Sequence, residues 1–213
     1  ETFQQEGLEI TKAVTQIQDQ LGTSFEQSGQ LLQDGLLAAV DQADFVGRVN
    51  DELKQLTDLG LPPDSVIALL VEASNKGLNV DVLAEPIIRL REATPATVDA
   101  LEAAFGPQGT QQLFATFQDA PLEAIQQISQ RLNELGPRSQ AAGLLLADVF
   151  SSAGEDAVAT ARSIGELETS LSALIDPTNE LVQRNQRLLE VNSQIAEAQK
   201  ELANQSRGIT ESF

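Results

Sequence analysis

The sequence contains no Cys, His, Trp, Tyr or Met, and its 8 Phe are the only aromatic residues. Without Cys, disulfides and thiolate metal ligands are excluded. Without His, the commonest general base and metal ligand is missing, and Cys and Tyr nucleophiles are absent as well. These absences remove most hydrolytic and redox mechanisms. We therefore expect no catalytic residues, no metal site and no cofactor.

Paired carboxylates are the one catalytic arrangement that this composition leaves open. Asp51-Glu52 and Glu155-Asp156 are the tightest pairs, and a glycan hydrolase uses two carboxylates. Adjacent residues on a helix point in different directions, and acids are common in the first turn of a helix. We interpret both pairs as solvated helix surface. A carboxylate-dependent glycan hydrolase is the enzyme alternative, and replacing Glu155 or Asp156 with Ala would test it.

The charge is strongly of one sign, because 32 acidic residues face 13 basic ones and the formal net charge is -19. Such a surface repels phosphate backbones, and no stripe of Lys and Arg exists to bind them, so we expect no direct contact with nucleic acid. No apolar run is long enough for a membrane span, and no signal peptide is recognisable. Because the chain does not begin with Met, we treat Glu1 as an internal start and the chain as a fragment.

What is present is a sequence of hydrophobic residues at helical spacing, mostly Leu, Ile, Val and Ala. Helix signals recur along the chain: polar residues or Pro at the starts and Gly at the ends. Ser24 and Gln27 can form a capping box, and Thr94 followed by Pro95 is typical of a helix start. We expect the first helix to end at Gly22, and the region around Pro86 to be a short turn followed by a helix over residues 86–92. The other expected helices cover residues 45–59, 64–76 (followed by Gly77), 95–105 (followed by Gly106-Pro107) and 121–135 (followed by Gly136-Pro137).

The predicted fold class is all-α, a multi-helix bundle followed by a long C-terminal helix of the coiled-coil type. We divide the chain into an N-terminal helix (1–22), a helical bundle (23–175) and a long amphipathic helix with a frayed end (176–213). Helices of this length joined by short connections are typical of a compact bundle. After Asp176-Pro177 the pattern changes from short helices to a single one of about 27 residues, which extends about 40 Å.

That last helix carries apolar residues at intervals of seven, and polar residues fall on the neighbouring positions. If the apolar series occupies the d positions of a coiled coil, the a positions are polar, and polar a residues specify register and oligomer state. We therefore predict self-association of this helix into a homo-oligomer, a trimer or hexamer. The alternative is that the helix packs on its own bundle. The predicted oligomerisation seam consists of Leu181, Asn185, Leu188, Asn192, Ile195 and Leu202.

Three stretches of the chain stand out as recognisable sequence patterns. They are Arg89-Leu-Arg-Glu-Ala-Thr-Pro-Ala-Thr-Val-Asp-Ala-Leu-Glu-Ala-Ala-Phe-Gly, Ile128-Ser-Gln-Arg-Leu-Asn-Glu-Leu and Leu146-Ala-Asp-Val-Phe-Ser-Ser-Ala-Gly-Glu-Asp-Ala. In this order along the chain they resemble stretches of the tail tape measure proteins of bacteriophages and prophages. The last is similar to the family pattern ADVFGGAGEDA, with Ser151 and Ser152 in place of two glycines. None of the three is a catalytic motif.

The resemblance implies a structural protein of the virion that lies in the lumen of the phage tail after assembly in the host cytoplasm. It implies that tail tube subunits polymerise around the protein and that its full length sets the tail length. A compact bundle adds little length, so we expect residues 23–175 to be an end domain that contacts the tail tube, tail-tip or baseplate proteins, or an assembly chaperone. The alternative is a bacterial coiled-coil adaptor unrelated to phage.

Overall fold

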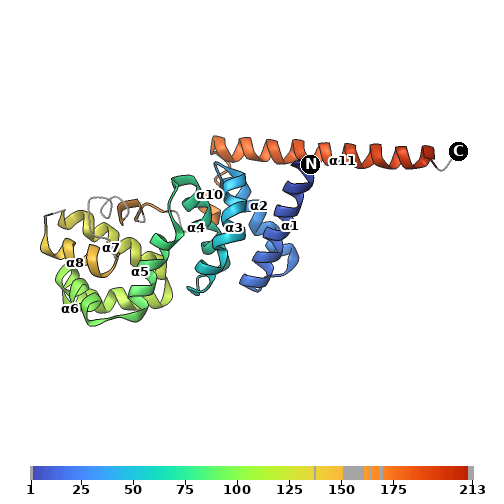
Figure 1. Cartoon of the computed structure of the whole chain (residues 1–213). Coiled ribbons are helices and arrows are strands. Elements are labelled where there is room, and N and C mark those ends of the chain that lie inside the picture. Colours follow the sequence, from blue (N-terminus) through green and yellow to red (C-terminus); the bar gives the residue numbers. More distant parts are fainter. Residues whose placement is uncertain (1, 137, 151–160, 164, 168–169, 211–213) are drawn as a thin grey trace.

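The computed structural model describes residues 2–136, 138–150, 161–163, 165–167 and 170–210, apart from the side chains of residues 2–6, 82, 196 and 198–210. Within these residues all regular secondary structure is helical, which confirms the all-α prediction (Figure 1). The helices are α1 (Thr2–Leu21), α2 (Phe25–Ala38), α3 (Gln42–Thr57), α4 (Pro63–Lys76), α5 (Val80–Glu92), α6 (Pro95–Asp119), α7 (Pro121–Leu135), α8 (Gln140–Asp148), α10 (Leu171–Leu174) and α11 (Glu180–Thr210).

Local capping signals fix several of the helix ends. Ser24 accepts a hydrogen bond from the Gln27 N–H, and the Gln27 side chain accepts one from the Ser24 N–H, so the predicted capping box at the start of α2 is confirmed. The Thr94 side chain caps α6 as predicted. Gly77 ends α4 with a left-handed φ of 63°, a conformation that favours glycine because it has no Cβ.

The prediction of a turn before Pro86 was wrong, because α5 is one continuous helix from Val80 with Pro86 inside it. Asn79 caps the helix start by accepting from the Asp81 N–H. Pro lacks the N–H that would close one helical turn, at a cost of about 3 kcal/mol. Burial of Leu83, Ile87 and Leu90 offsets this cost, since each buried side chain contributes about 1.5–3 kcal/mol.

The predicted break at Gly106 is confirmed, although it is much shorter than a loop. Gly106 has φ 73° and ψ 166°, and the helix resumes directly at Pro107, so α6 is two helical halves joined by a kink. Arg131 of α7 donates a hydrogen bond from Nε to the Ala104 carbonyl at 2.8 Å. The kink removes helical donors from this end of the first half, and Arg131 replaces one of them.

Helices α1 to α4 pack around one another and form the first half of the core (Figure 1). Phe45 of α3 is fully buried, and its ring lies against Gly35 of α2, where a Cβ would overlap it. Ile17 of α1 is also fully buried. The N-terminal helix thus contacts α2 and α3 and contributes to the same core as the helices that follow it.

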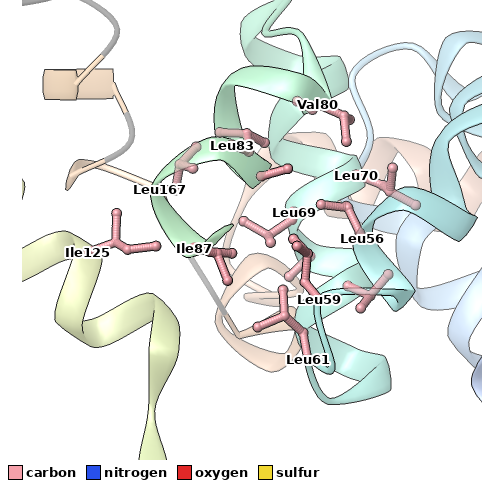
Figure 2. Close-up of a cluster of buried hydrophobic side chains, with 14 of the residues drawn as sticks. Leu56, Leu59, Leu61, Leu69, Leu70, Val80, Leu83, Ile87, Ile125 and Leu167 are labelled. Atoms are coloured by element: carbon pink, nitrogen blue, oxygen red, sulfur yellow. The ribbon is translucent and has the colours of Figure 1, made fainter. Parts of the chain in front are cut away.

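Helices α6, α7 and α8 form a second group, and α5 joins the two groups. Figure 2 shows Leu83 and Ile87 of α5 between Leu69 of α4 on one side and Ile125 of α7 on the other. Leu167, which follows the second group in the chain, lies at the same junction. The buried residues of both groups make one continuous hydrophobic core, so helices α1 to α8 and α10 together form what we call the body.

The described residues 161–163, 165–167 and 170–175 lead the chain from the second group back to the first. Gln126 of α7 donates to the Leu167 carbonyl at 2.7 Å, and Lys76 at the end of α4 donates to the Glu166 carbonyl at 3.0 Å. The short helix α10 then packs on α2 and α4. This return places the start of α11 beside α2, so residues that are distant in the sequence are neighbours there.

Candidate interaction surface

A hydrogen-bonded turn at residues 176–179 fixes the start of α11. One carboxylate oxygen of Asp176 accepts bonds from the Thr178 hydroxyl at 2.7 Å and the Thr178 N–H at 2.8 Å. These two bonds, the hydroxyl first, hold the pKa of Asp176 below its ordinary value. Asn179 then caps the helix by accepting from the Leu181 N–H at 2.9 Å. Helix α11 therefore leaves the body from a defined turn.

Asn185 ties α11 to the C-terminal end of α2. Its amide Nδ2 lies 2.8 Å from the Ala39 carbonyl oxygen, 3.0 Å from that of Leu37 and 3.3 Å from that of Leu36, and it donates to all three. The side chain is only 1 % exposed. The last carbonyls of a helix have no partner within the helix, and a buried carbonyl without a donor is costly. Asn185 of α11 therefore supplies a hydrogen-bond donor for the last carbonyls of α2, which have no donor within their own helix.

Two further amide side chains complete the C-terminal end of α2. Gln42 donates to the Leu36 carbonyl at 3.0 Å, and Asn75 donates to the Ala38 carbonyl at 3.1 Å. The Asn75 side-chain oxygen accepts from the Val40 N–H at 2.7 Å. Three amides from α3, α4 and α11 thus converge on one helix end. Removal of any of them leaves a backbone group with fewer partners.

A groove opens where α11 passes over α1, α2 and α3. Its volume is about 320 Å³. Val182 on the body side of α11 is completely buried, and Leu189 is half-buried further along that side. The residues that line the groove are Glu9, Ile10, Leu36, Gln42, Ala43, Val46, Leu189 and Asn192. The body-facing side of α11 therefore changes from fully packed at Val182 to an open groove at Asn192.

A second face of α11 is apolar and uncovered. Leu188 is 46 % exposed, Val191 50 % and Ile195 44 %. Their spacings of three and four residues place them on one side of the helix, and we call this set the apolar stripe. Val191 was not among the residues predicted from the sequence, although its spacing of three from Leu188 and four from Ile195 was visible there.

The structure separates the six residues of the predicted seam into different surroundings. Leu188 and Ile195 belong to the apolar stripe, Leu181 is half-buried and Asn192 is exposed at the groove. Asn185 is a correction, because its amide is buried against α2 of the same chain and is not available to a second copy. Leu202 lies outside the residues whose side chains the structure describes.

Charge is distributed unevenly between α11 and the rest of the chain. Glu180–Thr210 contains four basic and four acidic residues, whereas the remainder contains nine basic and 28 acidic residues. The excess negative charge therefore belongs to the remainder of the chain, and α11 carries no net charge.

No helix in the described part of the chain, α11 included, combines the length and the apolar character that a membrane span needs.

Of the Asp51-Glu52 pair, Glu52 contributes to a surface network on α3. Arg48 lies 2.8 Å from Asp44 and 3.2 Å from Glu52, and it also donates to the Leu78 carbonyl at 2.9 Å. A hydrogen bond from Ser74, followed by that from Arg48, holds the pKa of the Asp44 carboxyl below its ordinary value. Asp51 itself is exposed. The network joins α3 to the end of α4 and the chain after it.

The other carboxylate pair, Glu155-Asp156, lies outside the described residues, as do residues 151–157 of the third stretch used for the family resemblance. Comparisons with protein-family models, with curated proteins and with solved structures found no match for this chain.

Proposed function

We propose that this chain is a structural assembly protein whose copies associate through the apolar stripe of α11. The observation that carries the proposal is the exposure of Leu188, Val191 and Ile195 on one face of a helix that projects beyond the body (Figure 1). Exposed apolar residues that are contiguous mark interaction surfaces, whereas single exposed ones need no explanation. Removing such a stripe from water is a driving force for association.

The partner with the best fit is another copy of α11. The helix has as many basic as acidic residues, so copies of it can approach without the repulsion that separates the acidic bodies. Apolar residues at intervals of three and four are also the pattern by which helices pair with one another. The resemblance of the sequence to tape measure proteins supports placing this assembly in a phage tail, as part of the protein that sets the tail length.

Within that proposal the body and α11 have different tasks. A helix extends at a fixed rise of about 1.5 Å per residue, so α11 is suited to measuring length. The body folds back on itself and adds little length. Its role is to contact the tail tube, tail-tip or baseplate proteins, or an assembly chaperone, at one end of the assembly.

The first test is the mass of the chain in solution by light scattering over a range of concentrations. We expect a discrete oligomer that becomes a monomer when the chain is truncated before Pro177. Replacing Leu188 and Ile195 together with Ala should also produce a monomer, because the stripe loses most of its apolar area. The matched control is Gln186→Ala and Glu190→Ala, two exposed positions outside the stripe, which should leave the mass unchanged. A monomeric unaltered chain would disprove the assembly role.

The tail assignment has a separate test in the phage or prophage that encodes the chain. Inserting four extra heptads into α11, about 28 residues, should lengthen the tail by about 42 Å in electron micrographs. A flexible insertion of equal length between α7 and α8 is the control and should leave the tail length unchanged. Equal tail lengths in both cases would rule out the measuring role, even if the chain forms oligomers.

A further inference from the structure

The structure allows the pairing register of α11 to be assigned, provided that the chain self-associates as proposed above. The Leu and Ile series at positions 181, 188, 195, 202 and 209 repeats every seven residues. A coiled-coil seam needs a second column beside it. That column is either the one containing Asn185 and Asn192, or the one containing Val191, because each lies on a different side of Leu188.

Contacts within the chain make the start of the column that contains Asn185 and Asn192 unavailable to a partner helix. Asn185 donates to the carbonyls of Leu37 and Ala39, and Asn192 lines the groove against the body. The second column is free, because Val191 is 50 % exposed and lies on the same face as Leu188 and Ile195. The body and a partner helix can then occupy different sides of α11 at the same time.

We propose that α11 packs against α11 of a second copy in parallel and in register, with Leu188 and Ile195 at a positions and Val191 at the d position between them. In this register the next d position along the sequence is Ala198, and the preceding one is Arg184. Ala198 continues the apolar column. Two like-charged arginines facing each other are unfavourable, so Arg184 marks the end of the seam beside the body.

The residues that face each other across the seam, called layers, decide whether two copies of α11 pair parallel or antiparallel. In a parallel arrangement each residue meets its own counterpart, so the five successive layers from Leu188 to Leu202 are all apolar. In the antiparallel alignment that pairs Val191 with Ile195, four apolar layers remain, and Leu202 faces Arg184 at both ends of them. A charged group against an apolar residue loses water without gaining a partner, which is costly. The parallel alignment therefore gives the longer uninterrupted seam.

Cysteine cross-linking tests the register directly, because the chain has no cysteine of its own. In the full chain, Val191→Cys should form a disulfide-linked dimer in high yield with oxidised glutathione, since facing d residues bring the two thiols within disulfide range. Asn192→Cys is the matched control one residue away and should cross-link several-fold less. Glu190→Cys, an exposed position away from the stripe, sets the background.

Each other outcome overturns a different part of the proposal. More cross-linking at Asn192→Cys than at Val191→Cys would return the seam to the asparagine column. A mixture of Val191→Cys and Ile195→Cys chains that cross-links better than either variant alone would show antiparallel pairing. Both outcomes leave the assembly role intact if light scattering still finds an oligomer. Background cross-linking at all positions, with a monomer mass, would disprove the assembly role itself.

Discussion

At the scale of single residues, Asn185 has the most specific role in holding α11. Its side chain is 1 % exposed and donates to backbone carbonyls at the end of α2, 146 to 149 positions earlier in the sequence. Gln42 and Asn75 provide donors for the Leu36 and Ala38 carbonyls, but Asn185 is the donor to those of Leu37 and Ala39. The first heptad of α11 is therefore attached to the body by a polar contact as well as by Val182.

We expect Asn185→Ala to destabilise the chain by about 1–3 kcal/mol, because it leaves buried carbonyls without a donor. Urea unfolding would measure this change, and faster hydrogen exchange at the start of α11 would locate it. Asn192→Ala is the control on the same helix, and as an exposed substitution it should change stability by no more than about 0.5 kcal/mol. Equal effects of the two variants would mean that Asn75 and Gln42 hold the end of α2 without Asn185.

At the scale of the elements, the kink in α6 decides how the second helical group folds. Gly106 adopts φ 73° with ψ 166°, a backbone conformation that residues other than glycine rarely adopt. The kink redirects the second half of α6, and α7 and α8 pack on this helix.

A Cβ at position 106 would meet no neighbouring atom, so the cost of a substitution there comes from backbone strain alone. We therefore expect Gly106→Ala to lower the free energy of unfolding by on the order of 1–3 kcal/mol. Gly143→Ala in α8 serves as the control, because this exposed glycine has helical geometry and open space around it. That control should gain about 0.5–1 kcal/mol from its better helix propensity. Thermal or urea unfolding of both variants measures these changes. An unchanged stability of Gly106→Ala would show that the kink accepts a residue other than glycine without strain.

The helix boundaries could be predicted wherever the signal was local. Ser24, Gly77 and Thr94 act through neighbours within a few residues, so their roles were visible in the sequence. Pro86 was misjudged because the burial of α5 on two sides is a tertiary effect that outweighs its local cost. The surroundings of Asn185 depend on α2, a partner that is distant in the sequence. Its heptad position predicted a contact between copies, whereas the contact lies within one chain.

At the scale of the whole molecule, the separation of charge from α11 limits how copies can meet. The residues outside α11 include 28 acidic and nine basic side chains, so body-to-body contact between copies is electrostatically unfavourable. At physiological ionic strength this repulsion extends only about 8 Å, which is short compared with the length of α11. Copies joined along the apolar stripe can keep their bodies apart. The balanced helix and the acidic body thus favour contact along α11.

The attachment of α11 at Asn185 also determines how the molecule would respond to mechanical force. A force along α11 reaches the body by two connections. One is the turn at residues 176–179, and the other is the set of Asn185 hydrogen bonds, which join the helix directly to the end of α2. Helix α2 in turn contacts α1, α3 and α4. Tension on the projecting helix is therefore shared among four helices of the first group, and the body resists it as a unit instead of unravelling from its C-terminal side.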